Sequence, residues 1–131
     1  PRKGVGYEAR AGKGGVIITA GLLAVSEALR AAEATGFGVM VMPWLNVVDD
    51  AWIADIAARY PIVVTLDNHY RAGGQGHYLL AALAQHATAR PRCLSLGLDD
   101  VPPSGRNDEV LAALAIDGES IARRIKAFVS A

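Results

Sequence analysis

The chain has 131 residues, of which 52% are hydrophobic and 20% are charged, and its 13 basic residues balance its 13 acidic ones. A chain of this length buries enough surface on folding to form a core without disulfides, and its composition excludes a disordered or fibrous protein. The zero net charge argues against DNA or RNA as a partner. No apolar run reaches the ~20 residues that a membrane-spanning helix needs, so we expect no membrane partner.

The single cysteine, Cys93, cannot form an internal disulfide or a cysteine-based zinc site alone. This usage is typical of a reducing intracellular compartment, and we expect a cytoplasmic protein in which Cys93 is a small buried hydrophobe. The sequence starts at Pro1 rather than at a methionine. We therefore expect a processed chain or a segment of a longer polypeptide.

Short apolar segments recur along the chain and predict the strands of a sheet. They are too short for helices and do not alternate, which is typical of strands buried on both faces. Their residue ranges are 16–20, 39–42, 62–66 and 93–96. Ahead of them, Val5, Tyr7 and Ala9 alternate with small or polar residues and predict a short edge strand.

Helical periodicity separates these segments. The first helix has apolar residues at three- and four-residue spacing, a polar side that includes Glu27, and Gly36 as its stop signal. Asp49 is expected to cap the second helix, which ends before Pro61. A third helix, marked by leucines over 79–83, follows a glycine-rich turn.

Two further helices close the chain. Asn107 or Asp108 is expected to cap a short helix through Leu114, and Asp117 opens a last amphipathic helix. Strands alternating with helices imply right-handed crossovers. We therefore expect an α/β fold with three layers, α/β/α, and a mostly parallel five-stranded sheet with one short antiparallel edge strand. No repeat or linker divides residues 1–131, which are expected to form a single domain.

Ligands of open parallel sheets bind beyond the carboxyl ends of the strands, and the richest segment there is Asp67, Asn68 and His69. Asp67 and His69 can share a face, and such a pair can act in acid–base chemistry or orient a metal. Only His77 is nearby as a further ligand, so no metal site is predicted. The preferred interpretation is plainer, with the three side chains hydrogen-bonding loop backbone or a partner surface.

Gly73, Gly74 and Gly76 come next, at the start of the third helix. One interpretation is that their backbone amides approach an anion, which the helix dipole favours. The other, which we prefer, is a tight turn with a positive φ and close packing of helix on sheet. The spacing is not a dinucleotide fingerprint. Together the two segments form a candidate ligand or interface edge, comprising Asp67, Asn68, His69, Gly73, Gly74 and Gly76.

The order of these motifs resembles the C-terminal domain of transketolases, from about Val16 to Ile125. In that family the third strand typically ends Val-Glu-Asp-His and the turn reads Gly-Gly-Leu-Gly. The matching residues here are Leu66-Asp67-Asn68-His69 and Gly73-Gly74-Gln75-Gly76. Leu22 and Leu23 stand where the family usually has Ser and Glu, and only Val47-Val48-Asp49 represents its Lys-Pro-x-Asp.

The resemblance implies a thiamine-diphosphate enzyme that moves two-carbon ketol units between sugar phosphates. In that family other domains hold thiamine diphosphate and Mg²⁺ through a Gly-Asp-Gly motif that is absent here. We therefore expect no catalytic, cofactor-binding or metal-binding residue in this chain, and no activity from the isolated domain. Its expected partners are the thiamine-binding domains or subunit of the same enzyme, in a homodimer or hetero-oligomer.

Several alternatives stay open. The same domain type closes the β subunits of 2-oxoacid dehydrogenases and the deoxyxylulose-phosphate synthases, so the motifs resemble the superfamily better than one member. A stand-alone module that binds a small phosphorylated ligand at residues 67–76 is a further possibility. A regulatory or assembly subunit that docks a catalytic partner through an apolar face is another.

Overall fold

Strands and helices alternate along residues 2–131, the part of the chain that the computed structural model describes. The strands are β1 (Tyr7–Arg10), β2 (Val16–Thr19), β3 (Gly38–Val41), β4 (Ile62–Tyr70) and β5 (Arg92–Leu98). The helices are α1 (Leu22–Thr35), α2 (Asp50–Arg59), α3 (Gln75–His86), α4 (Asn107–Ala113) and α5 (Gly118–Ser130).

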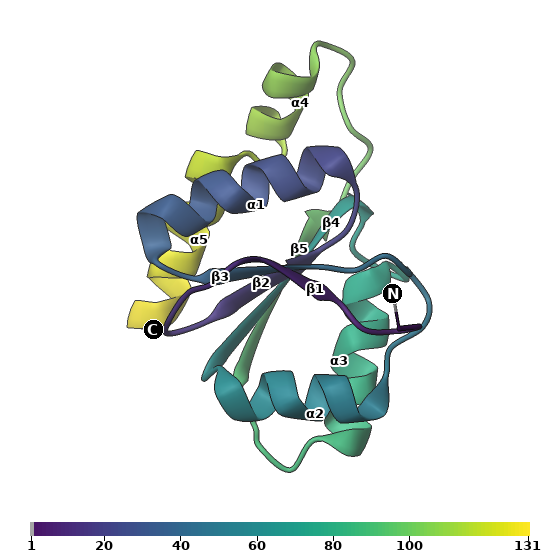
Figure 1. Cartoon of the computed structure of the whole chain (residues 1–131). Helices are drawn as coiled ribbons and strands as arrows, with labels where there is room; N and C mark the ends of the chain where they lie inside the picture. Colours follow the sequence, from purple (N-terminus) through teal and green to yellow (C-terminus); the bar gives the residue numbers. More distant parts are fainter. Residues whose placement is uncertain (1) are drawn as a thin grey trace.

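The five strands form one sheet in the order β1-β3-β2-β4-β5. Strands β2 to β5 run parallel, and β1 pairs antiparallel with β3 at one edge. Helices α1 and α5 cover one face and α2 and α3 cover the other, and α4 is drawn above α1, on the side away from the sheet (Figure 1). This confirms the predicted three-layer fold and its antiparallel edge strand.

Each face of the sheet has its own apolar core. In β2, Ile17 points toward α1 and α5, whereas Val16 and Ile18 point toward α2 and α3. All three are fully buried, because helices cover both sides of the strand. Cys93 is only half-buried, at the margin of the α2–α3 core, where burial raises the pKa of its thiol.

Two of the predicted helix signals are confirmed by backbone geometry. The Asp49 side chain accepts a hydrogen bond from the Trp52 N–H at 2.8 Å at the start of α2. Gly36 ends α1 with a φ of 78°, and its N–H donates to the Ala32 carbonyl. The predicted caps of α4 are wrong by a residue: Arg106 precedes the helix and donates its N–H to the Glu109 carboxylate at 3.2 Å.

The start of α5 is capped from another helix. Asp117 precedes α5 but makes no capping hydrogen bond. Instead, Glu27 of α1 accepts the Gly118 N–H at 2.6 Å, across a sequence separation of 91 residues. Glu27 is 8% exposed, so its predicted place on the polar side of α1 is wrong. A side chain at Gly118 would lie 2.6 Å from Arg30 Cβ, which shows how closely the two helices pack.

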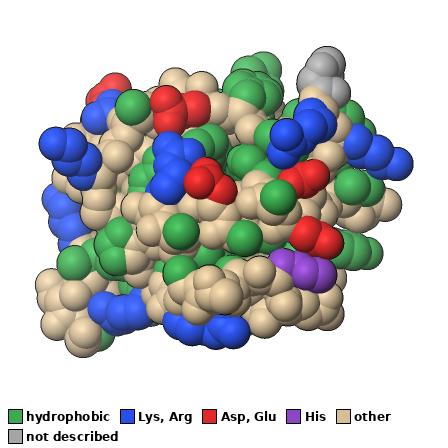
Figure 2. All heavy atoms as spheres, turned by 60° about the horizontal axis from the view of Figure 1, so that its bottom comes forward, with side chains coloured by type: hydrophobic (Ala, Val, Ile, Leu, Met, Phe, Trp, Pro, Cys, Tyr) green, Lys and Arg blue, Asp and Glu red, His purple; other side chains and the backbone are tan. Residues whose placement is uncertain are grey.

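The outer surface is mixed in character. Figure 2 shows the side of the molecule below the sheet in Figure 1, where basic and acidic side chains are interspersed and no region of one sign stands out. Within residues 2–131, none of the helices combines the length and apolar character needed to cross a bilayer.

Candidate functional site

Strand β4 is longer than predicted and carries the candidate residues on its end. The expected strand stopped at Leu66, but β4 continues to Tyr70, which pairs with Leu98 of β5. Arg71 then donates its N–H to the Leu98 carbonyl at 2.9 Å. The segment between the predicted strand and the third helix is therefore a strand end and a short turn.

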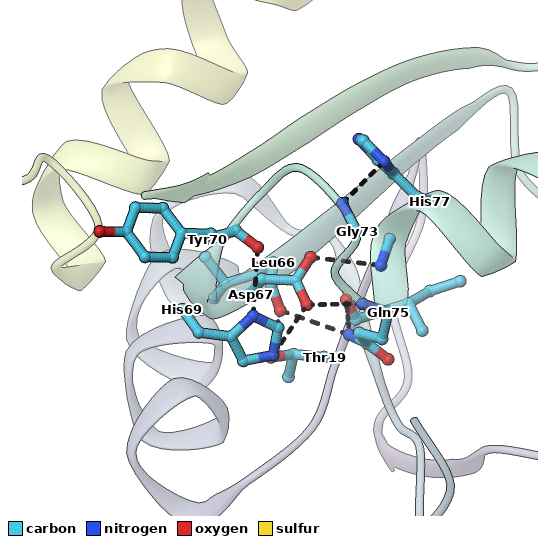
Figure 3. A network of polar contacts seen from close by, with 10 residues as sticks. Thr19, Leu66, Asp67, His69, Tyr70, Gly73, Gln75 and His77 are labelled. Atoms are coloured by element: carbon cyan, nitrogen blue, oxygen red, sulfur yellow. Dashed lines mark hydrogen bonds and ion pairs between the residues drawn. The ribbon is translucent and has the colours of Figure 1, made fainter. Parts of the chain in front are cut away.

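Asp67 caps α3 from the neighbouring strand. Its Oδ1 accepts the Gln75 N–H at 3.0 Å and its Oδ2 accepts the Gly76 N–H at 3.2 Å (Figure 3). Gly74, the residue before the helix, has no side chain to do this. A carboxylate at this position satisfies amides that have no partner within the helix and lies at the positive end of the helix dipole. Asp67 thus joins β4 to α3.

Asp67 is 2% exposed, and this burial raises the pKa of its carboxyl above the ordinary value. The hydrogen bond from Gly76, the positive field of His69 and the hydrogen bond from Gln75 oppose this effect, in that order, followed by His77. Burial prevails because taking a charge out of water costs more than these contacts return.

Turn geometry and close packing account for the three glycines. Gly73 has a φ of 75°, which side chains other than glycine's rarely allow. A Cβ at Gly74 would lie 2.7 Å from Asp67 Cγ, and one at Gly76 would lie 2.4 Å from Thr65 Oγ1. Every amide hydrogen of residues 73–76 already has an acceptor within the chain, so none is left for an anionic ligand.

Of the two nearby histidines, only His69 joins Asp67. Its Nε2 lies 3.5 Å from Asp67 Oδ1, and its Nδ1 lies 3.1 Å from the Tyr70 carbonyl oxygen, so both ring nitrogens face oxygen acceptors. The His69 side chain is 48% exposed. His77 lies on the other side of the turn, where its Nδ1 accepts the Gly73 N–H (Figure 3). Residues 2–131 contain no group of three or more His, Cys, Asp or Glu side chains placed to hold a metal ion.

Gln75 is a further member of the network that the sequence analysis did not single out. Its Nε2 donates to the carbonyls of Ile18 and Leu66, both at 3.3 Å. Thr19 Oγ1 also donates to Leu66 at 2.8 Å. The Gln75 side chain therefore links α3 to β2 and β4. The one available signal was an amide in place of the Leu of the family's Gly-Gly-Leu-Gly turn.

A groove runs along the carboxyl edge of the sheet above this network. One hollow of about 210 Å³ joins a second of about 490 Å³, and both are lined by Pro43, Leu45, His69 and Gln75. Asp67 and Asn68 line the first, and Gly73, Gly74, Trp44 and Tyr78 line the second. Gly76 lies behind the groove against Thr65. The edge predicted from sequence thus has two parts. Asp67 caps α3 from inside, and His69, Gly73 and Gly74 face the groove.

Comparison with known proteins assigns the chain to a family. The model of the family described as "Transketolase, C-terminal domain" matches residues 4–121. The 1-deoxy-D-xylulose-5-phosphate synthase of Saccharophagus degradans is 34% identical over 97% of this chain and 19% of its own length. Relatives of the same name from Aeromonas hydrophila and other bacteria are similar at 32–34% identity. The chain spans about a fifth of the length of these relatives.

Solved structures show the same fold. A split-gene transketolase, described as an inactive β4 tetramer, superimposes with a TM-score of 0.82 and 21% identity, over 96% of this chain and 42% of that one. The transketolase of Campylobacter jejuni gives a TM-score of 0.66 and 16% identity, over 95% of this chain and 19% of that one. With a family model that covers most of its length and relatives at 34% identity, this chain belongs to the transketolase C-terminal domain family.

Proposed function

We propose that this chain is the C-terminal domain of a thiamine-diphosphate-dependent transferase that forms 1-deoxy-D-xylulose 5-phosphate. The observation that carries this proposal is the 34% identity, over 97% of the chain, to a synthase of that name. The deoxyxylulose-phosphate synthase, one of the alternatives that the motifs left open, is thus favoured over the expected ketol transfer between sugar phosphates. A cytoplasmic location and a role in a dimer or hetero-oligomer belong to the same proposal.

Ketol transfer between sugar phosphates is the second candidate function. It is favoured by the end of β4, where an acid, an amide and His69 follow one another as in the transketolase pattern. The turn that follows also keeps the Gly-Gly-x-Gly spacing. These motifs belong to the family as a whole, so they support this function less strongly than the identity supports the synthase.

Two observations on the described residues support placing the cofactor outside this domain. The described residues offer no metal-ligand cluster for the ion that accompanies a diphosphate, and the amides at the start of α3 are bonded to Asp67. We therefore derive no chemical step in this domain, and we propose that thiamine diphosphate and Mg²⁺ are held elsewhere in the enzyme. The contribution of this chain is structural, with Asp67 and Gln75 acting as positioning residues that fix α3 and the groove.

The test is to express the uncut polypeptide, or this chain together with the product of the adjoining upstream coding sequence, and to assay both reactions. With thiamine diphosphate and magnesium present, we expect formation of 1-deoxy-D-xylulose 5-phosphate, detected by mass spectrometry. Ketol transfer without that product would establish the second candidate. Absence of both, with no thiamine-binding polypeptide encoded nearby, would overturn the proposal in favour of a stand-alone binding module.

A further inference from the structure

The exposed apolar side chains of this chain gather at one end of the sheet. Among the described residues, seven large hydrophobic side chains are exposed, and five of them lie at or after the carboxyl ends of the parallel strands. Leu22 opens α1 after β2, Leu45 follows β3, and Tyr70 ends β4. The other two are Tyr78, in the first turn of α3, and Val101, in the loop after β5.

The exposure of these side chains has no local explanation. Leu22 is 89% exposed in the first turn of α1, where acidic or capping side chains favour the helix and leucine gains nothing. Leu45 is 53% exposed and lines the groove together with Tyr78 and Trp44. Clustered exposed apolar residues of this kind mark interaction surfaces.

The character of the groove fits a protein surface better than a charged metabolite. Its larger hollow is lined by aromatic, aliphatic, amide and glycine residues, and His69 is the one titratable side chain among its lining residues other than Tyr78. Depletion of charge and enrichment of aromatic side chains are typical of the buried centre of a protein interface.

The N-terminal segment reaches the same edge. The Asp49 N–H donates to the Gly4 carbonyl at 2.8 Å, and Arg2 lies 3.4 Å from the Asp49 carboxylate. Asp49 ends the loop that follows β3, the loop that carries Trp44 and Leu45.

We propose that this edge, from Leu22 through Leu45 to Tyr78, docks onto the thiamine-binding part of the same enzyme. The inference rests on the proposed function: in an enzyme of which this family forms the C-terminal domain, the remaining four-fifths of the polypeptide precede it. Polypeptide that enters through residues 2–4 arrives at the end of the loop that carries Trp44 and Leu45, so it covers the apolar edge with the least chain.

Cysteine protection in the assembled enzyme tests this surface. In a Cys93→Ala background, Leu45→Cys is compared with Val129→Cys, which is 46% exposed and lies with Phe37 near the amino end of β3. We expect maleimide to label Leu45→Cys in the native enzyme on the order of 100-fold more slowly than in urea, because only another part of the enzyme can cover it. Val129→Cys should be slowed by no more than about tenfold.

A benzophenone amino acid in place of Leu45 identifies what covers the edge. Crosslinks that map to sequence upstream of this chain support the proposal. Crosslinks into a second copy of residues 2–131, free labelling at position 45, or equal protection at 45 and 129 would each overturn it. The outcome is separate from the enzymatic assay: an active enzyme with a freely labelled edge refutes the surface alone, and an inactive one with upstream crosslinks refutes the function alone.

Discussion

Removing the Asp67 carboxylate tests whether this residue is the structural cap of α3. Asp67→Ala leaves the buried N–H groups of Gln75 and Gly76 without acceptors. Each unsatisfied buried amide costs about 1–3 kcal/mol, and part of this is offset because a buried carboxyl is also removed. We therefore expect Asp67→Ala to lower the free energy of unfolding by about 2–4 kcal/mol.

Urea unfolding followed by circular dichroism measures this loss, with Asp55→Ala as the matched control. Asp55 is an exposed carboxylate that pairs with Arg59 at 3.4 Å, and its removal should cost about 0–0.5 kcal/mol. Asp67→Asn should fall between the two, because its amide oxygen still accepts one N–H while its NH₂ group faces the other. If Asp67→Ala were as stable as Asp55→Ala, the capping argument would be refuted.

The same carboxyl makes a prediction about pH. Burial raises the pKa of Asp67 above its ordinary value of 3.8, so the folded state keeps the proton to higher pH than the unfolded state does. The stability linked to this group is present below about pH 3.8 and is lost as pH rises through the folded pKa. The free energy of unfolding of the wild type, minus that of Asp67→Asn, should therefore fall as pH rises above 4.

His69 and His77 are the titratable groups whose positive fields oppose the rise in the pKa of Asp67. The comparison is therefore repeated in a His69→Gln, His77→Gln background, where the fall should persist because burial is its main cause. A difference that stayed constant with pH, or that rose, would show that the folded pKa is not raised.

Three further predictions follow from contacts elsewhere in the fold. Gly76→Ala should cost about 2–4 kcal/mol in urea unfolding, because its Cβ meets Thr65 Oγ1, whereas Gly73→Ala should cost only the ~1–2 kcal/mol of a positive φ. Glu27→Ala should lower the melting temperature by several degrees because the Gly118 N–H loses its acceptor, whereas exposed Glu33→Ala on the same helix should leave it unchanged. Leu22→Glu should leave the free energy of unfolding unchanged or raise it by up to about 1 kcal/mol, because a carboxylate at this position interacts favourably with the dipole of α1. A sharp drop in the melting temperature would contradict the exposed position of Leu22.

The layers of the fold could be predicted because the signals for them are local. Apolar segments such as 62–66 are buried on both faces, and their composition alone distinguishes them from surface strands. Asp49 and Gly36 act through hydrogen bonds to residues three or four positions away. The tail of β4 was missed because Asp67, Asn68 and His69 carry no apolar signal and interrupt the pairing with β5, which resumes at Tyr70.

Glu27 shows where polarity misleads. Its position lies on the buried stripe of α1, three residues after Ala24 and four before Ala31, both of which are buried. The charge of Glu27 predicts an exposed position, whereas its spacing from Ala24 and Ala31 predicts a buried one. Its burial is tolerated because its carboxylate accepts the Gly118 N–H of α5, 91 residues away, and such a partner has no local signal.

The residues of the candidate edge differ in burial, and this redirects the search for function. Sequence reasoning selected polar and glycine residues, of which Asp67, Gly74 and Gly76 prove to be buried parts of the framework. What faces outward is His69 together with apolar residues such as Leu45 and Tyr78. An apolar residue in a sequence is assigned to the core by default, and only the fold shows that these two have no core to enter. Because the internal cap holds α3 and the apolar wall is exposed, substitutions at Asp67 should act first on stability, and those at Leu45 first on assembly.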